Sequence, residues 1–129
     1  MLAVDTNIIV RYVTRDDPEQ AERAKRVVDE NETFVTTTVL LETAWVLGST
    51  YRYSRAKTAR ALRLFAGLPR VTLEDLPLAF EALDWMDRGM DFADALHLAS
   101  ARGCDAFITF DRRLAGTAAA LSNIEVRTP

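Results

Sequence analysis

Short apolar runs alternate with longer amphipathic stretches along the whole chain. The runs are too short to be buried helices, so we predict strands at residues 2–4, 33–35, 71–73, 106–110 and 124–126. Between them, apolar residues recur at helical spacing, which predicts helices near residues 8–13, 18–28, 39–47, 55–65, 74–88, 92–102 and 112–121. This alternation is typical of an α/β fold, here an α/β/α sandwich with a central, mainly parallel sheet covered by helices. No repeat or linker interrupts the pattern, so residues 1–129 are predicted to form a single domain.

Local signals mark where several of the helices begin and end. Asp17 suits an N-cap position, Pro18 fits the first turn, and Gln20 can reach back as in a capping box. The helix at residues 39–47 is apolar nearly all round, so we expect it to be largely buried and to end at Gly48.

Two of the predicted strands end in an aspartate. Asp5 follows the apolar run at 2–4, and Asp111 follows the run at 106–110. Parallel strands joined by right-handed crossovers point their carboxyl ends to one edge of the sheet, where open α/β sheets bind ligands. We therefore expect both carboxylates on the same edge. The structural alternative is that Asp5 only caps the helix that starts near Asn7.

Three further acids lie on predicted helices. Glu42 is the only charge in the apolar helix, and because burying an unpaired carboxylate is costly it needs a partner, either an arginine or a metal ion. Asp91 suits an N-cap and Asp94 the third helical position. Both could therefore simply stabilise the amino-terminal, positive end of the helix dipole. On a helix they share a face with His97, which we interpret as packed against its neighbours and not as a base or ligand.

A cluster of Asp5, Glu42, Asp94 and Asp111 would consist of hard oxygen ligands. Such ligands, without a Cys–His set, suit Mg²⁺ or Mn²⁺ and not zinc. Like charges packed closely raise one another's pKa unless a cation is present, so the cluster makes sense only with a metal. The matching chemistry is attack of a metal-activated water on a phosphodiester, with the cation stabilising the leaving oxygen.

The motifs that carry these acids resemble those of a PIN domain. They are the Val-Asp-Thr-Asn opening, the lone Glu42, Asp-Phe-Ala-Asp-Ala-Leu-His-Leu-Ala and Ile-Thr-Phe-Asp-Arg-Arg-Leu, and together they span essentially the whole chain. More narrowly, they are similar to the ribonuclease toxins of bacterial VapBC toxin–antitoxin pairs. The resemblance implies that Asp5, Glu42, Asp94 and Asp111 form the family's acidic quartet, which holds Mg²⁺ or Mn²⁺ and directs hydrolysis of RNA.

The resemblance also implies accessory residues and partners. Thr6 and Asn7 follow the first acid as in many family members. The hydroxyls of Thr6 and Thr109 can support the metal-binding acids without binding the metal themselves. Asp91 is either an accessory acid or only the helix cap. The family alone implies a homodimer, a cognate VapB-like antitoxin whose carboxyl-terminal segment blocks the site, and a preference for RNA over DNA.

Positive charge is concentrated around the predicted helix at 55–65. The basic residues include Arg52, Arg55, Lys57 and Arg60. A charge run of this kind is usually a solvated face. The alternative is a surface for a phosphate backbone or an acidic partner, with nearby tyrosines available to stack on bases.

Composition narrows the classes of function. With 129 residues, 49% of them hydrophobic, the chain suits one ordinary globular domain. No apolar run approaches the roughly 20 residues of a membrane span, and no signal peptide is visible, so we expect a cytoplasmic protein without a membrane partner. A net charge of −3 argues against nonspecific coating of nucleic acid, but bound divalent cations would reverse the local sign at a carboxylate site. Trp45, Trp85 and Cys104 are expected in the core.

Two other interpretations differ in function. Aspartyl phosphotransferases also begin with an apolar strand ending in Asp, but they use a second acid two residues later, where this chain has Asn7. The other alternative is a PIN-like module that binds RNA or a protein without catalysis. The intact quartet argues against it, since such a module would show loss of the acids.

Overall fold

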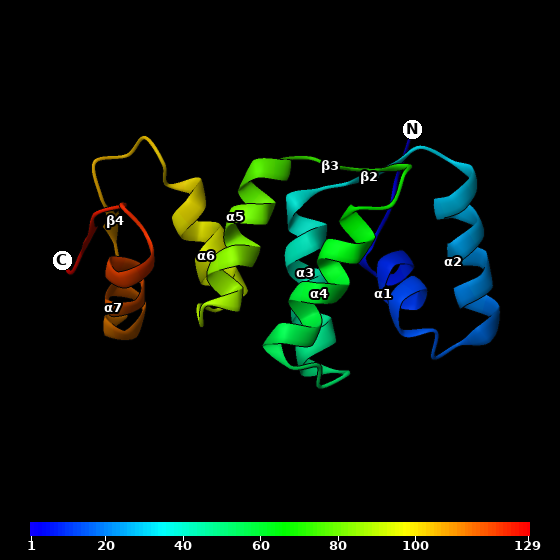
Figure 1. Ribbon diagram of the computed structural model, residues 1–129, viewed down its shortest axis with the longest axis horizontal. Coiled ribbons are helices and arrows are strands. Elements are labelled where there is room, and N and C mark those ends of the chain that lie inside the picture. Colours follow the sequence, from blue (N-terminus) through cyan, green and yellow to red (C-terminus); the bar gives the residue numbers. More distant parts are fainter. The chain divides into compact units, whose positions relative to one another are not determined.

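The computed structural model describes all 129 residues, and the chain forms two compact units, Met1–Leu76 and Pro77–Pro129. Helices and parallel strands alternate along both (Figure 1). The predicted α/β class with parallel strands and intervening helices is therefore confirmed, and it is consistent with the predicted α/β/α arrangement. None of the helices is both long enough and apolar enough to cross a membrane.

The first unit contains a three-stranded parallel sheet in the order β1-β2-β3. Its strands are β1 (Leu2–Ala3), β2 (Thr33–Val35) and β3 (Val71–Leu73), and its helices are α1 (Thr6–Thr14), α2 (Pro18–Glu30), α3 (Thr37–Ser49) and α4 (Arg55–Ala66). Helix α1 packs against both α2 and α3, and α3 packs against α4. The fully buried side chains of this unit include Ile9, Val28, Val35, Leu47 and Leu62.

The second unit begins within α5 (Leu76–Asp87) and contains a separate pair of parallel strands. Its other elements are α6 (Phe92–Ser100), β4 (Phe107–Ile108), α7 (Arg112–Leu121) and β5 (Val126–Arg127). Buried Leu83, Trp85, Leu98 and Leu114 supply its interior, so the core position predicted for Trp85 is confirmed.

The N-cap predicted for α2 is confirmed, but the capping box predicted with it does not form. Asp17 accepts a hydrogen bond from the Gln20 amide at 3.0 Å, and Pro18 opens α2. The side chain of Gln20 does not reach back to complete a capping box, because its Oε1 accepts a hydrogen bond from Arg11 Nε at 2.7 Å.

Three expectations about burial are wrong. The first two residues of the predicted strand at 2–4 are exposed, since β1 lies at one end of its sheet and pairs only with β2. Helix α3 continues through Gly48 to Ser49 and buries one face only, so Trp45 is 68% exposed. Cys104 is exposed as well.

Candidate active site

In the first unit, the candidate site is built at the junction of β1 and α1. The β-type pairing continues past β1, where the Val4 amide donates to the Phe34 carbonyl at 3.1 Å. Asp5 then takes the N-cap position of α1, and its Oδ1 accepts from the Thr6 amide at 2.7 Å. The carboxylate is exposed. Asp5 is therefore a helix cap and also an acid open to solvent, so the two interpretations of this residue are compatible.

Glu42 reaches the same place from α3. The buried hydroxyl of Thr6 donates to Glu42 Oε2 at 3.1 Å, which joins residues 36 positions apart. Glu42 is exposed, so the predicted burial is wrong, and it contacts no arginine that would make it half of a structural ion pair. Its position on α3 directs it to the first turn of α1 instead.

Both acids line one open cleft of about 280 Å³. The lining also includes Thr6, Asn7, Arg11 and Tyr51. Arg11 and Tyr51 were not predicted as site residues. Arg11 had a signal, because it is the only charged residue of α1, whereas Tyr51 joins the cleft only through the packing of the tertiary structure.

In the second unit, two candidate acids lie at the start of α6. Asp91 is the N-cap, and its Oδ2 accepts from the Asp94 amide at 3.2 Å. Asp94 is half-buried, and burial is the largest cause that raises its pKa above the ordinary value. The negative charges of Asp91 and Asp111 raise that pKa further, and His97 opposes them. These carboxylates therefore lie near enough to repel one another. A bound cation would offset that repulsion.

Asp111 sits at the start of α7, directly after β4 and its short extension. Its Oδ1 accepts from the amides of Arg113 and Leu114, each at 3.0 Å. Its own amide donates to Thr109 Oγ1 at 3.0 Å. Thr109 thus holds the backbone that presents Asp111.

The structure does not bring all the predicted residues together. Asp5 and Glu42 belong to the first unit, whereas Asp91, Asp94 and Asp111 belong to the second. Strands β1 and β4 belong to different sheets, so the shared edge expected for Asp5 and Asp111 stays a prediction. Within neither unit do three His, Cys, Asp or Glu side chains gather closely enough to hold a metal ion. The donors available in each unit are nevertheless carboxylate oxygens, which fit Mg²⁺ or Mn²⁺.

The predicted basic surface lies outside the cleft. Its members Arg52, Arg55, Lys57 and Arg60 are all exposed, and none of them lines the cleft. Lys57 Nζ lies 4.0 Å from the centre of the Tyr53 ring. His97 is exposed, so its predicted packing into neighbours is wrong.

Comparison with known proteins adds the family. A family model described as PIN domain matches residues 2–120. No curated protein matches the chain. PIN domains are generally nucleases that bind RNA, and they usually use divalent metal ions.

Proposed function

The chain belongs to the PIN-domain family, and on that premise we propose that it is a Mg²⁺- or Mn²⁺-dependent endoribonuclease. The observation that carries the proposal is the cleft in which Asp5 and Glu42 meet, with the Thr6 hydroxyl hydrogen-bonded to Glu42 Oε2 at 3.1 Å.

Asp5, Glu42, Asp94 and Asp111 are the metal ligands and catalytic acids of this proposal. It requires residues 1–129 to act as a single domain in which the two units bring the four carboxylates together. Burial and then the negative charges of Asp91 and Asp111 raise the pKa of Asp94, which supports placing Asp94 and Asp111 in one acidic cluster. When bound there, a divalent cation supplies a nucleophilic water at neutral pH and stabilises the charge that develops on the phosphate and leaving oxygen.

The chain's own accessory residues have separate roles in the proposal. Thr6 orients the Glu42 carboxylate, and Asn7 offers an amide to the cleft it lines. Thr109 fixes the backbone ahead of Asp111, and Asp91 holds the first turn of α6 while adding negative charge near Asp94.

The biological setting is proposed from the resemblance of the motifs. We propose a cytoplasmic toxin of a type II toxin–antitoxin pair, active as a homodimer and blocked by a VapB-like antitoxin. Arg52, Arg55, Lys57 and Arg60 offer an exposed basic surface to RNA or to that partner.

The test is cleavage of a mixed RNA pool by the wild-type protein and Asp5→Asn, each with EDTA, Mg²⁺ or Mn²⁺. We expect cutting only by the wild type with metal. Glu22→Gln, which removes an exposed carboxylate from α2 outside the cleft, is the matched control and should cut normally. Wild-type cutting by Asp5→Asn would overturn the mechanism. Tight RNA binding with no cutting in any metal would favour a non-catalytic PIN-like module.

A further inference from the structure

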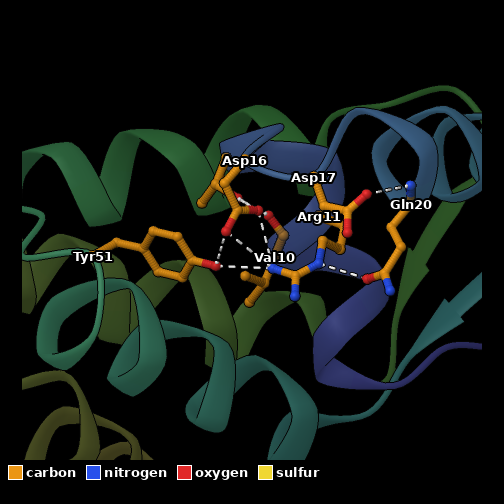
Figure 2. Close-up of polar contacts among 7 residues, drawn as sticks. Val10, Arg11, Asp16, Asp17, Gln20 and Tyr51 are labelled. Carbon is orange, nitrogen blue, oxygen red and sulfur yellow. Dashed lines mark hydrogen bonds and ion pairs between the residues drawn. The ribbon is translucent and has the colours of Figure 1, made fainter.

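A group of polar side chains holds Arg11 at the edge of the acidic cleft. Its Nε donates to Gln20 Oε1 at 2.7 Å, and its Nη1 donates to Asp16 Oδ1 at 3.0 Å and to Tyr51 Oη at 2.9 Å (Figure 2). The Tyr51 hydroxyl in turn donates to Asp16 Oδ2 at 2.7 Å. Thr14 adds a further hydrogen bond to Asp16 at 2.9 Å. The guanidinium is therefore fixed by Asp16 from the loop between α1 and α2, by Gln20 from α2 and by Tyr51 from the segment before α4.

This arrangement leaves one edge of the guanidinium available. No hydrogen bond involves Arg11 Nη2, and Figure 2 shows that nitrogen without a partner. A planar guanidinium whose orientation is already set loses little conformational entropy when it binds a phosphate oxygen. The hydrogen bond that Arg11 donates to Tyr51 and the charge of Asp16 also raise the pKa of Arg11, so its side chain stays positively charged.

Arg11 belongs to two adjoining hollows. It lines the cleft that contains Asp5, and it also lines a groove of about 290 Å³ between α1 and α2. Asn7 is shared by the cleft and the groove in the same way, so the groove starts beside the acids. A third hollow, of about 260 Å³, shares Arg23 with the groove and continues along α2 to Arg26 and, at its far end, Glu30.

The groove is lined by basic and not by acidic side chains, although Asp16 pairs with Arg11 beside it. Its lining includes Arg11 and Arg23 and contains no acid. Arg23 is exposed and forms no ion pair, although the chain as a whole carries a net charge of −3. Arg23 and Arg26 lie three residues apart on one helix face, which separates them by a rise of about 4.5 Å.

We propose that the groove between α1 and α2 carries the phosphate backbone of the RNA strand as it leaves the acidic cleft. Arg11 contacts the phosphate nearest the acids through its free Nη2, and Arg23 and then Arg26 contact phosphates further along. This inference rests on the proposed nuclease function and identifies the surface that binds the substrate. It also assigns substrate binding to α2, in addition to or in place of the basic residues around α4.

The test measures binding apart from cutting. Fluorescence anisotropy with a labelled 12-nucleotide polyuridine RNA is recorded in EDTA over a range of salt concentrations, for the full chain. We expect Arg23→Gln and Arg26→Gln each to weaken binding by up to about tenfold, the size of one charge-assisted hydrogen bond. Because each variant removes one phosphate interaction, each should also reduce the slope of log K against log salt by about 0.7. Both side chains are exposed, so the variants should fold normally, as circular dichroism would verify.

Arg88→Gln is the matched control, because it removes an exposed arginine that lines none of the three hollows by the same change. Full affinity and an unchanged salt slope in Arg23→Gln and Arg26→Gln would overturn the proposal and leave the groove to a protein partner or to solvent. Arg60→Gln makes the same change on α4, and loss of affinity in that variant alone would also overturn the proposal and assign the strand to α4. The outcomes separate this inference from the proposed function. Binding that depends on Arg23 without metal-dependent cutting refutes the nuclease only, and cutting that ignores Arg23 refutes the groove only.

Discussion

Thr6 contacts both candidate site acids of the first unit, Asp5 and Glu42. Its amide donates to Asp5 Oδ1 at 2.7 Å, and its hydroxyl donates to Glu42 Oε2 at 3.1 Å. Because Thr6 is buried, its position is set by packing. Its two hydrogen bonds in turn orient the exposed carboxylates of Asp5 and Glu42. A residue that hydrogen-bonds to a metal ligand orients it, so its loss lowers metal affinity or activity.

Replacing Thr6 by Val keeps the shape of the side chain and removes the hydroxyl. We expect RNA cleavage to fall by about 10- to 100-fold, the usual cost of losing a group that orients a ligand. The free energy of unfolding should fall by only about 1 kcal/mol, the net value of one hydrogen bond. Cleavage assays and chemical denaturation measure the two effects, and Thr6→Ser should restore much of the activity. Undiminished cutting by Thr6→Val would remove Thr6 from the site.

At the scale of elements, several candidate acids also serve as helix caps. Asp5, Asp91 and Asp111 occupy the N-cap positions of α1, α6 and α7. A cap needs only an oxygen acceptor near free amides, whereas a metal ligand needs the negative charge. Substitutions can therefore separate the structural role from the chemical one.

Asp111 provides the clearest separation of these roles. Asn is as good an N-cap as Asp, so Asp111→Asn should keep the bonds to the Arg113 and Leu114 amides and leave stability unchanged. Asp111→Ala should lower the free energy of unfolding by about 1 kcal/mol. Both variants should lose nuclease activity if the carboxylate is a ligand. Denaturation curves and cleavage assays on the two variants measure this, and an active Asp111→Asn would leave Asp111 as a cap only.

Asp16 accepts hydrogen bonds from Arg11, Thr14 and Tyr51, and this cluster joins α1 to the segment before α4. The stability that the cluster contributes depends on pH. The hydrogen bond from Tyr51 is the largest cause that lowers the pKa of Asp16, followed by the Thr14 hydroxyl and the Arg11 charge. An acid with a lowered pKa in the folded state stabilises the fold above the usual aspartate value of 3.8, and that stability is lost as pH falls through the lowered value.

Asp16→Asn should therefore be less stable than the wild type at pH 7 and should match it at the acid end of the range. Melting temperatures of the two proteins from pH 7 down to pH 2 measure the difference. Tyr51→Phe keeps the ring and removes the main cause of the shift, so its acid transition should move to higher pH. A stability difference that does not change with pH would show that the Asp16 charge contributes nothing.

At the scale of the whole molecule, the decisive question is how the two units act together. The first unit supplies Asp5 and Glu42, and the second supplies Asp94 and Asp111. If one metal site needs acids from both, then binding energy links the units. A ligand that binds only the folded state raises stability by mass action, by about 2.7 kcal/mol at a concentration 100 times its Kd.

Mn²⁺ should raise the melting temperature of the wild type, and Asp5→Asn and Asp94→Asn should each remove most of that rise. The reason is that each variant deletes a ligand from a different unit. Thermal denaturation with and without millimolar Mn²⁺ is the measurement, with Glu22→Gln as the control that keeps the full rise. If one variant kept the full rise, a single unit would hold the metal alone and the single-domain proposal would fail.

Much of the local structure was determined by the sequence itself. The strand at 33–35, the strand at 71–73 and the helix at 112–121 have the predicted bounds, and Asp17 and Asp91 cap the predicted helices. These features depend on neighbouring residues, because hydrophobic period, caps and prolines act within a few positions. The candidate acids could be recognised for the same reason: Asp5 and Asp111 follow predicted strands, Asp91 and Asp94 begin a predicted helix, and Glu42 is the only charge in an apolar one.

Only the tertiary structure decided which distant side chains meet and which faces are covered. An apolar run at 106–110 becomes a strand only where β5 offers a partner, so β4 is limited to Phe107–Ile108. The apolar helix α3 could not reveal that Trp45 is exposed or that Glu42 faces Thr6. The hydrogen bond from Arg11 to Tyr51 spans 40 positions, and the one from Tyr51 to Asp16 spans 35. Contacts of that kind depend on how helices pack around a common core, which no local pattern specifies.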